Sequence, residues 1–491
     1  MSNGTAGSSP AVRTMAAMLC VALSSGCDRA DKDGPIAISV IGGPLQLADP
    51  ERSPLDSGAS LMLHATAQGL VAFDAEGRIE PALAERWIMT DDGLSFIFRI
   101  RRTEWSNGRP VTSVEVANRL NRAMRTGGVN RLRGLFGGVE RAIAMTGQVV
   151  EVRLRRPEPD ILQLFAQPEM ALFRVKPSQG AGPYRVHSRR DGVTRLRPKD
   201  DADEQAKTKV SDRKDVRARG EGVARAVARF SARNVALASG GSFADLPIAR
   251  AARPSANQFR VDPAYGLFGL AVMADSKALA DVRARRALAM AIDRPRLVRL
   301  FGVANWQPAL STLPLQLDSA APPAALEWVQ LDLAARRARA KSLIDALGAP
   351  VEVRVALPPG PGARLLFAGL AADWQRIGVS ARLVGLRDPA DLRLIDEVAP
   401  QTAAYWYLSR ISCARGLVCS DAGETALRAA STSTDPNERA AALAEADAAI
   451  ASAQPFIPLA LPLRWSLVAS ELTGWRPSAF ATHPLRHMRE R

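Results

Sequence analysis

The segment 69–124 constrains the fold more than any other part of the chain, because strand, turn and helix signals follow one another in it without a gap. Apolar side chains recur at every second position at Phe96, Phe98 and Ile100, and this alternation predicts a β-strand with one buried face. A short helix end, a turn and a helical turn are expected upstream of this strand. The segment therefore predicts a mixed α/β scaffold.

A tight turn and an amphipathic helix complete this segment. Asn107 and Gly108 predict the turn, because both residue types tolerate positive φ. Thr112 and Glu115 form a T-x-x-E capping box, which marks the start of a helix. The apolar face of that helix is formed by Val116, Leu120 and Ala123. The segment carries no catalytic signal.

Three runs within the segment resemble the signature of a known family. Residues 81–87 (PALAERW), 91–94 (DDGL) and 105–112 (WSNGRPVT) have the order and spacing found in the family 5 solute-binding proteins of ABC transporters. Two later runs, 180–184 (GAGPY) and 281–294 (DVRARRALAMAIDR), are similar to the same family. The resemblance implies an α/β fold of the two-lobed periplasmic binding protein type, class II-like, with an enlarged first lobe and a cleft between the lobes.

The resemblance also implies how the chain divides. The expected parts are a signal peptide (1–27), a linker (28–35), the first lobe (36–265), the second lobe (266–457), and a return to the first lobe with the C-terminal tail (458–491). A strand at Phe456–Leu459 is expected to carry the chain back into the first lobe. The charged segment 198–222 lacks apolar periodicity, so a solvated loop or insertion is expected there.

The second half of the chain alternates helix and strand patterns, as the second lobe of the family does. The expected elements are a helix over 334–347, a strand over 351–357, a helix over 363–377, a strand over 379–384 and an alanine-rich helix over 437–452. Met273 stands where relatives often have asparagine.

The N-terminus resembles a lipoprotein signal. Arg13 precedes a short apolar run, 15–23, which is too short to span a bilayer. Small residues then lead to Cys27, which becomes the lipidated first residue of the mature protein if the resemblance holds. Plain secretory cleavage and an uncleaved anchor are the alternatives. The expected location is the periplasm or cell envelope, with lipid anchoring.

Two cysteines remain in the second half, at Cys413 and Cys419. In an oxidising compartment, a local disulfide between them is the natural interpretation. Two free thiols are the alternative. A metal site is disfavoured, because no histidine or further cysteine lies nearby and the chain has only 4 histidines.

The ligand-contacting residues are expected within 391–419. In relatives, this region carries a carboxylate that, in peptide binders, holds the amino terminus of the ligand. Asp396 takes that role if 396–400 is a shortened version of the family pattern. In a second alignment Trp406 takes the place of the family's tryptophan, and Ser409 and Arg410 then stand where the acid would be. The two alignments predict opposite charges in the cleft.

An aromatic cluster lies beside these residues, at Tyr405, Trp406 and Tyr407. Aromatic side chains offer large contact area to varied ligands, so at least one of the three is a candidate for the cleft wall. In the other interpretation, alternate residues of a strand pack into the core.

The net charge of +15 raises nucleic acid as a partner. The positive charge is spread along the chain and interleaved with acids, however, which favours a dispersed surface charge. The sequence contains no recognisable enzyme motif, and no cofactor is expected. The expected function is capture of a peptide or other small solute by a monomer, for delivery to an ABC permease. The alternative is a non-transporting family member that serves as an envelope scaffold or ligand sensor.

Overall fold

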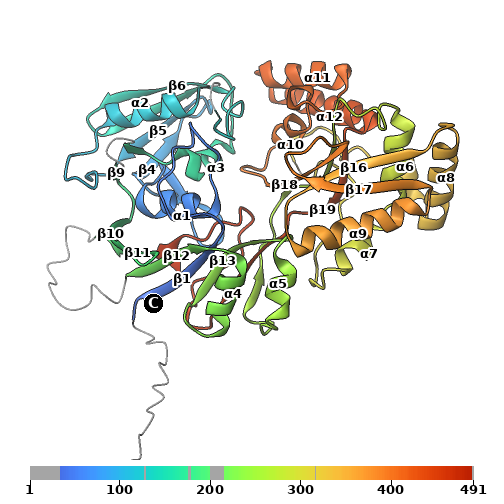
Figure 1. Ribbon diagram of the computed structural model, residues 1–491. Helices are drawn as coiled ribbons and strands as arrows, with labels where there is room; N and C mark the ends of the chain where they lie inside the picture. The colour runs from blue at the N-terminus through green and yellow to red at the C-terminus, as the bar shows by residue number, and fades with distance from the viewer. Residues whose placement is uncertain (1–33, 126–128, 175–178, 200–214, 316, 489–491) are drawn as a thin grey trace, which may run out of the picture.

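The computed structural model describes residues 34–125, 129–174, 179–199, 215–315 and 317–488. The chain forms two lobes (Figure 1): one combines the N-terminal part with the C-terminal tail, and the other begins with β15 (Gly266–Val272). The expectations for the signal segment, for Cys27 and for most of the linker fall outside the described residues, as does the centre of the charged segment, 200–214.

A seven-stranded sheet forms the base of the first lobe. Its strands lie in the order β10 (Tyr184–Arg190), β11 (Val193–Pro198), β12 (Val216–Glu221), β1 (Ile36–Ile41), β13 (Leu237–Ser242), β20 (Arg464–Val468) and β14 (Phe259–Val261). β1 runs parallel to both β12 and β13. Helices α1 (Ser57–Thr66), α4 (Val223–Ser231) and α5 (Leu246–Ala251) pack around this sheet.

The expectation of a loop over all of 198–222 is wrong at its C-terminal end, where β12 lies beside β1. Buried Val216 and Ala218 alternate with exposed Arg217, but the strand is too short for that pattern to stand out in a charged segment. Asp215, which precedes the strand, is fully buried and pairs with Arg195 of β11. Asp215, which made the segment look like a charged loop, therefore belongs to an ion pair inside the sheet.

A four-stranded antiparallel sheet forms the upper part of the first lobe. It consists of β4 (Ala84–Met89), β5 (Ser95–Ile100), β7 (Val149–Leu154) and β6 (Val139–Thr146), in that order, with α2 (Ser113–Ala123) packed on β6 and β7. The predicted strand at 96–100 is confirmed. The helical turn expected upstream of this strand is wrong, because the chain there forms β3 (Ile79–Pro81) and β4.

The N-cap at Thr112 is confirmed, but the capping box predicted with it is only half formed, because Glu115 makes no bond to the Thr112 backbone N–H. The Thr112 Oγ1 atom accepts a hydrogen bond from the Glu115 backbone N–H at 3.2 Å. Val116 and Leu120 are buried on the inner face of the helix, as the periodicity predicts. The Glu115 carboxylate turns instead towards Trp105, whose Nε1–H donates to it at 3.1 Å.

Smaller elements join the two sheets of the first lobe. They are β2 (Val71–Phe73), α3 (Ile161–Phe165), the 3-10 turn η1 (Pro168–Met170), β8 (Phe173–Arg174) and β9 (Gln179–Gly180).

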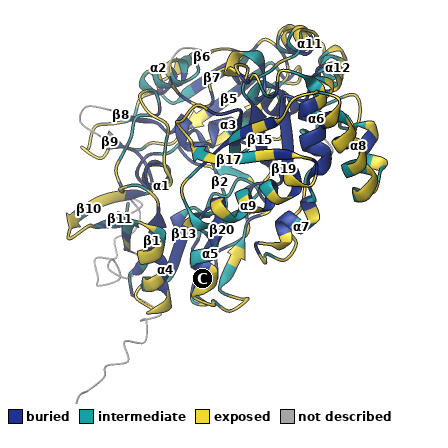
Figure 2. Cartoon of the chain, turned by 45° about the vertical axis from the view of Figure 1, so that its right-hand side comes forward, coloured by how far each residue is buried: buried dark blue, intermediate teal, exposed yellow. Residues whose placement is uncertain are grey.

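The second lobe is built on a five-stranded sheet. Its order is β17 (Val379–Gly385), β16 (Val351–Leu357), β18 (Leu392–Val398), β15 and β19 (Phe456–Ala460). The helices are α6 (Val282–Ala291), α7 (Arg294–Arg299), α8 (Leu333–Asp345), α9 (Pro361–Gln375), α10 (Ala404–Arg410), α11 (Asp421–Thr432) and α12 (Pro436–Ala453), with 3-10 turns η3 (Glu327–Gln330) and η4 (Cys413–Arg415). Figure 2 shows the inner strands buried and the outer helix faces exposed.

The chain crosses between the lobes twice, from β14 to β15 and from β19 to β20. The expected return strand, Phe456–Leu459, is therefore misplaced: it is β19, which pairs with β15 in the second lobe, and the return follows it. Gly266 begins β15 at a φ of 151°, and a Cβ atom there would lie 2.0 Å from the carbonyl oxygen of Glu397. Glycine is needed at this crossing because the backbones of β15 and β18 approach so closely.

The last residues close on the first lobe. They include the 3-10 turn η5 (Leu485–His487), whose Leu485 packs in the core with β1 and β12.

Candidate functional site

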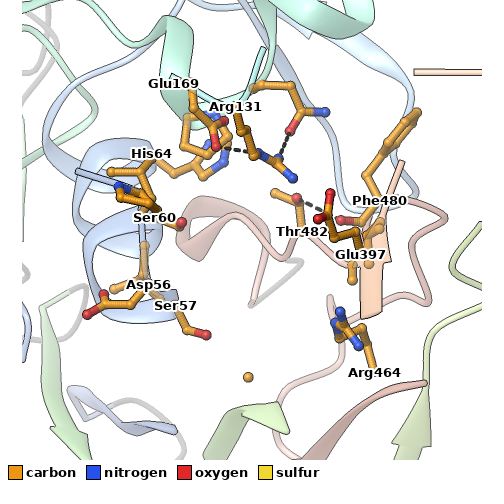
Figure 3. A pocket seen from close by; sticks show the side chains of 18 of the residues that line it. Asp56, Ser57, Ser60, His64, Arg131, Glu169, Glu397, Arg464, Phe480 and Thr482 are labelled. Atoms are coloured by element: carbon orange, nitrogen blue, oxygen red, sulfur yellow. Dashed lines mark hydrogen bonds and ion pairs between the residues drawn. The ribbon is translucent and has the colours of Figure 1, made fainter. Parts of the chain in front are cut away.

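A cavity of about 740 Å³ lies between the lobes. The first lobe lines it with α1, the loop 129–133, η1, the ends of β13 and β20, and the tail 480–485, and the second lobe lines it with the end of β18, with Arg410 of α10 and with Arg415. Figure 3 shows side chains from both lobes around it. Its charged and hydroxyl-bearing lining residues include Asp56, Ser57, Ser60, His64, Arg131, Glu169, Asp396, Glu397, Arg410, Arg415, Arg464 and Thr482.

Helix α1 supplies the polar wall of the first lobe. Asp56 caps the helix by accepting a hydrogen bond from the Ala59 N–H at 2.7 Å. Ser57, Ser60 and His64 follow at helical spacing, which places their side chains along one face, towards the cavity (Figure 3). The opposite face of α1 is buried through Met62 and other apolar residues.

The structure places Asp396 in the cavity wall and pairs it with a first-lobe cation. The Nη1 atom of Arg464, on β20, donates to Asp396 Oδ1 at 2.8 Å, and Nη2 donates to the Asp396 carbonyl oxygen at 3.0 Å. Burial raises the pKa of the Asp396 carboxyl, and the nearby Arg464 offsets only part of that rise. The carboxylate is thus already engaged by the protein.

Arg410 also lines the cavity, and it pairs with Glu397 of β18. Its Nε atom is buried and has no hydrogen-bond partner among the described residues. The two sequence alignments treated an acid and a cation as alternatives, but the structure brings both to the same cavity. Each has a partner of opposite charge, so neither alone sets the charge of the cleft.

The aromatic cluster does not line the cavity. Tyr405, Trp406 and Tyr407 lie on helix α10, where a strand was expected. Trp406 and Tyr407 are buried in the core with their ring centroids 4.8 Å apart, and Tyr405 lies under the guanidinium group of Arg439. Because consecutive residues of a helix point in different directions, this helix buries its aromatic face and turns Arg410 to the cavity. The expectation of an aromatic cleft wall from this cluster is therefore wrong.

Arg131 and Glu169 are site residues that sequence reasoning missed. Glu169 is 4% exposed and forms an ion pair with Arg131, which also donates to the Gln167 side-chain oxygen at 3.1 Å. These residues lie in a loop and a 3-10 turn that carry no motif. No signal in a single sequence distinguishes Arg131 from the many other arginines of the chain.

His64 was missed as well, and its environment keeps it neutral. Its Nε2 atom is buried and has no partner among the described residues. Burial, with the positive charges of Arg486 and Arg131, lowers the pKa of His64 to about 4. His64 therefore offers the cavity an uncharged imidazole at neutral pH.

Cys413 and Cys419 form a disulfide, and the loop between them carries Arg415 into the cavity wall. Backbone hydrogen bonds tie this loop to the end of β15: Ala274 N–H donates to the Gly416 oxygen at 3.0 Å, and Val418 N–H donates to the Val272 oxygen at 2.9 Å. Met273, the residue that departs from the family, forms a β-bridge with Leu417 here. The sequence did contain one signal for Arg415 as a site residue, because this charged residue lies between two cysteines that were expected to pair.

The two lobes touch beside the cavity. The Gln167 Nε2–H group donates to the Pro400 carbonyl oxygen at 2.8 Å, and the Thr402 N–H donates to Gln163 Oε1 at 2.9 Å. These hydrogen bonds join η1 and α3 of the first lobe to the segment that follows β18. The two lobes are therefore in direct contact beside the cavity.

Comparison with known families now decides the class of protein. The family model of the bacterial extracellular solute-binding proteins, family 5, matches residues 78–409, which is more than half of the chain. The chain belongs to this family.

Family 5 structures share the fold over nearly the whole molecule. The murein tripeptide binding protein MppA of Escherichia coli superposes with a TM-score of 0.78 at 18% identity, over 92% of this chain and 98% of that one. The Haemophilus influenzae protein OppA, in complex with the peptide RPPGFSPFR, superposes with a TM-score of 0.76 at 16% identity, over the same shares. The two-lobed α/β fold is thereby established.

Curated relatives match over short segments only. The probable deoxycholate-binding periplasmic protein YgiS of Escherichia coli is 39% identical over 66 residues, which are 13% of this chain and 12% of that protein. The glutathione-binding protein GsiB of Shigella flexneri is 24% identical over 156 residues, or 32% of this chain and 30% of that protein. The chain thus aligns with less than a third of these relatives.

No helix within the described ranges is long and apolar enough to cross a membrane.

Proposed function

We propose that this family 5 protein is the extracytoplasmic binding component of an ABC importer and that it captures a peptide or peptide-like solute. The observation that carries the proposal is the cavity of about 740 Å³ between the two lobes, lined by charged and hydroxyl side chains from both. Its volume lies in the range of small-molecule sites. The solved relative that holds a nine-residue peptide has the same fold.

The mechanism is binding and release. A ligand that contacts both lobes favours the closed form, because it gains interactions there that the open form lacks. The closed form then docks on a membrane permease. Turnover of the ligand forms no part of this proposal.

We also propose that Cys27 is lipidated and tethers the monomeric protein to the cell envelope. Mass spectrometry of the mature protein tests this, since lipidation adds acyl chains to an N-terminal Cys27. A Cys27→Ala variant is expected to be secreted without the acyl mass and to leave the membrane fraction. An unmodified N-terminus in the wild type would contradict the proposal.

A binding screen tests the ligand class. Short peptides are expected to raise the melting temperature of the protein, because a ligand that binds only the native state stabilises it by mass action. Small-angle scattering of the same samples measures whether the lobes close. A screen in which no peptide raises the melting temperature would contradict the proposal.

A further inference from the structure

We propose that Arg131, Arg133, Arg410 and Arg415 form one binding site for an anionic group of the ligand, a carboxylate or a phosphoryl group. The inference rests on the proposed function and assigns a charge to the ligand. All four arginines line the interlobe cavity. Arg131 and Arg133 belong to the first lobe, whereas Arg410 and Arg415 belong to the second.

The first observation is the placement of like charges across the lobe boundary. The charged neighbours that act most on Arg415 are Arg410, Glu397 and Arg133, and two of these three repel it. Burial together with Arg410 and Arg133 lowers the pKa of Arg415, and Glu397 offsets this only in part. Arg133 thus carries the same charge as Arg410 and Arg415 across the lobe boundary, and an anion held between them would offset this repulsion.

The second observation is that Arg131 is held ready for a ligand. Its Nε atom pairs with Glu169 and its Nη2 atom donates to Gln167, and both partners are 4% exposed. The Arg131 side chain itself is 43% exposed. A guanidinium group has five N–H donors in a planar fork, so the two bonds fix its orientation and leave other donors for the cavity.

The third observation links Arg131 to lobe closure. Gln167, which accepts from Arg131, donates in turn to the carbonyl oxygen of Pro400 in the second lobe. A ligand anion on Arg131 therefore acts on a side chain that already bridges the lobes. Arg410 contributes from the other side, where its pair with Glu397 leaves the Nε atom without a partner among the described residues.

The remaining charges limit the anion site to one part of the cavity. Asp396 is engaged by Arg464, and Asp262 lies 3.1 Å from His483. Asp56 lies on α1, well apart from Arg131 and Glu397 in Figure 3. This wall of α1 leaves room for an uncharged or cationic part of the same ligand.

Matched peptides test the inference. The same tripeptides are prepared as free acids and as C-terminal amides, and their binding is measured by calorimetry together with that of inorganic phosphate. We expect the amides to bind about tenfold more weakly than the free acids, because they lose a charge-assisted contact. Phosphate alone is expected to stabilise the protein if a phosphoryl group is the natural anion.

Arg415→Gln is the decisive variant, since Glu397, the acid that acts on Arg415, is already paired with Arg410 and is not left unpaired by the change. This variant is expected to bind the free-acid peptides about tenfold more weakly than the wild type and to bind the amides with unchanged affinity. Arg428→Gln, an exposed arginine of α11 outside the cavity, is the control with the same loss of charge. The anion site is overturned if the wild type binds acids and amides with equal affinity. It is also overturned if Arg415→Gln and Arg428→Gln lose equal affinity for the free acids. Peptide binding itself would stand in both cases. If neither peptides nor phosphate bind, the anion site and the proposed function both fall.

Discussion

Asp391 shows at the scale of one residue how a buried charge is kept in this fold. It is 4% exposed and accepts hydrogen bonds from Ser276 Oγ at 2.8 Å, from the Arg354 N–H at 2.8 Å and from Arg354 Nε at 2.9 Å. Burial acts to raise the pKa of Asp391, but the hydrogen bonds outweigh it and hold the pKa below 3.8. The carboxylate joins β16 to the start of β18, the strand that leads to the cavity.

Asp391→Asn is therefore expected to cost about 2 kcal/mol of the free energy of unfolding, because a neutral amide at this buried position cannot accept all of these hydrogen bonds. Since the folded pKa is lowered, this stabilisation is present above about pH 4 and is lost as the pH falls through the folded pKa. Urea unfolding of wild type and variant between pH 7 and pH 3 measures both effects. Glu352→Gln, an exposed change on β16, serves as the control, and an equal effect of both changes would contradict the prediction.

His64 also loses stabilisation as the pH falls, but for a different reason: burial disfavours its charged imidazolium form. Its folded pKa of about 4 lies below the ordinary value of 6.5, so between these values the unfolded chain binds more protons and stability falls as the pH falls. We expect the wild type to lose about 2 kcal/mol between pH 7 and pH 5 that a His64→Gln variant does not lose. The difference between their unfolding free energies at the two pH values measures this, and parallel curves would rule it out.

At the scale of the element, the disulfide loop 413–419 connects a core strand to the cavity. It is anchored on β15 and carries Arg415. In a Cys413→Ser/Cys419→Ser variant the short loop gains freedom when unfolded, which costs about 2 kcal/mol of stability. Arg415 also loses its fixed position.

The double serine variant is therefore expected to bind free-acid peptides more weakly than the wild type, with little change for the amides. Calorimetry measures the affinities, and denaturant unfolding measures the stability. Reduction of the wild type must reproduce both effects. An unaltered preference for acids over amides would show that the loop does not position Arg415.

The elements that were predicted correctly are those whose local pattern and tertiary environment agree. β5 alternates because one of its faces is buried, and α2 begins at a capped threonine. β4 departs from this rule, since five of its six residues are not buried and its sequence has a helical composition. Pairing with β5 decides its conformation, and no local signal reports that pairing.

The site residues likewise fall into those that the sequence predicted and those that it did not. Asp396 and Arg410 were found because the family resemblance pointed to the region 391–419, which contains β18 and the segment that follows it. Helix α10 was missed, because three consecutive aromatic residues fit a strand as well as a helix. Arg131 and Glu169 reach the cavity only through the packing of η1 against the loop 129–133, which no property of either residue predicts.

For the whole molecule, the balance between open and closed lobes decides how tightly a ligand binds. Two glutamines of the first lobe bridge to the second: Gln167 donates to Pro400, and Gln163 exchanges hydrogen bonds with Thr402. These contacts hold the lobes in the arrangement that encloses the cavity. They therefore contribute to ligand affinity without touching the ligand.

Gln163→Ala isolates this contribution, because Gln163 is not a cavity residue. Removing its bonds to Thr402 is expected to disfavour closure by about 1 kcal/mol and to weaken every ligand about fivefold, acids and amides alike. Small-angle scattering should show a larger radius of gyration without ligand and the wild-type value at saturation.

Gln148→Ala, on the turn between β6 and β7, is the control away from the lobe boundary. A loss confined to the free acids would mean that Gln163 acts on the anion site and not on closure. An unchanged radius and affinity would mean that the hydrogen bonds between the lobes contribute nothing to the closed state.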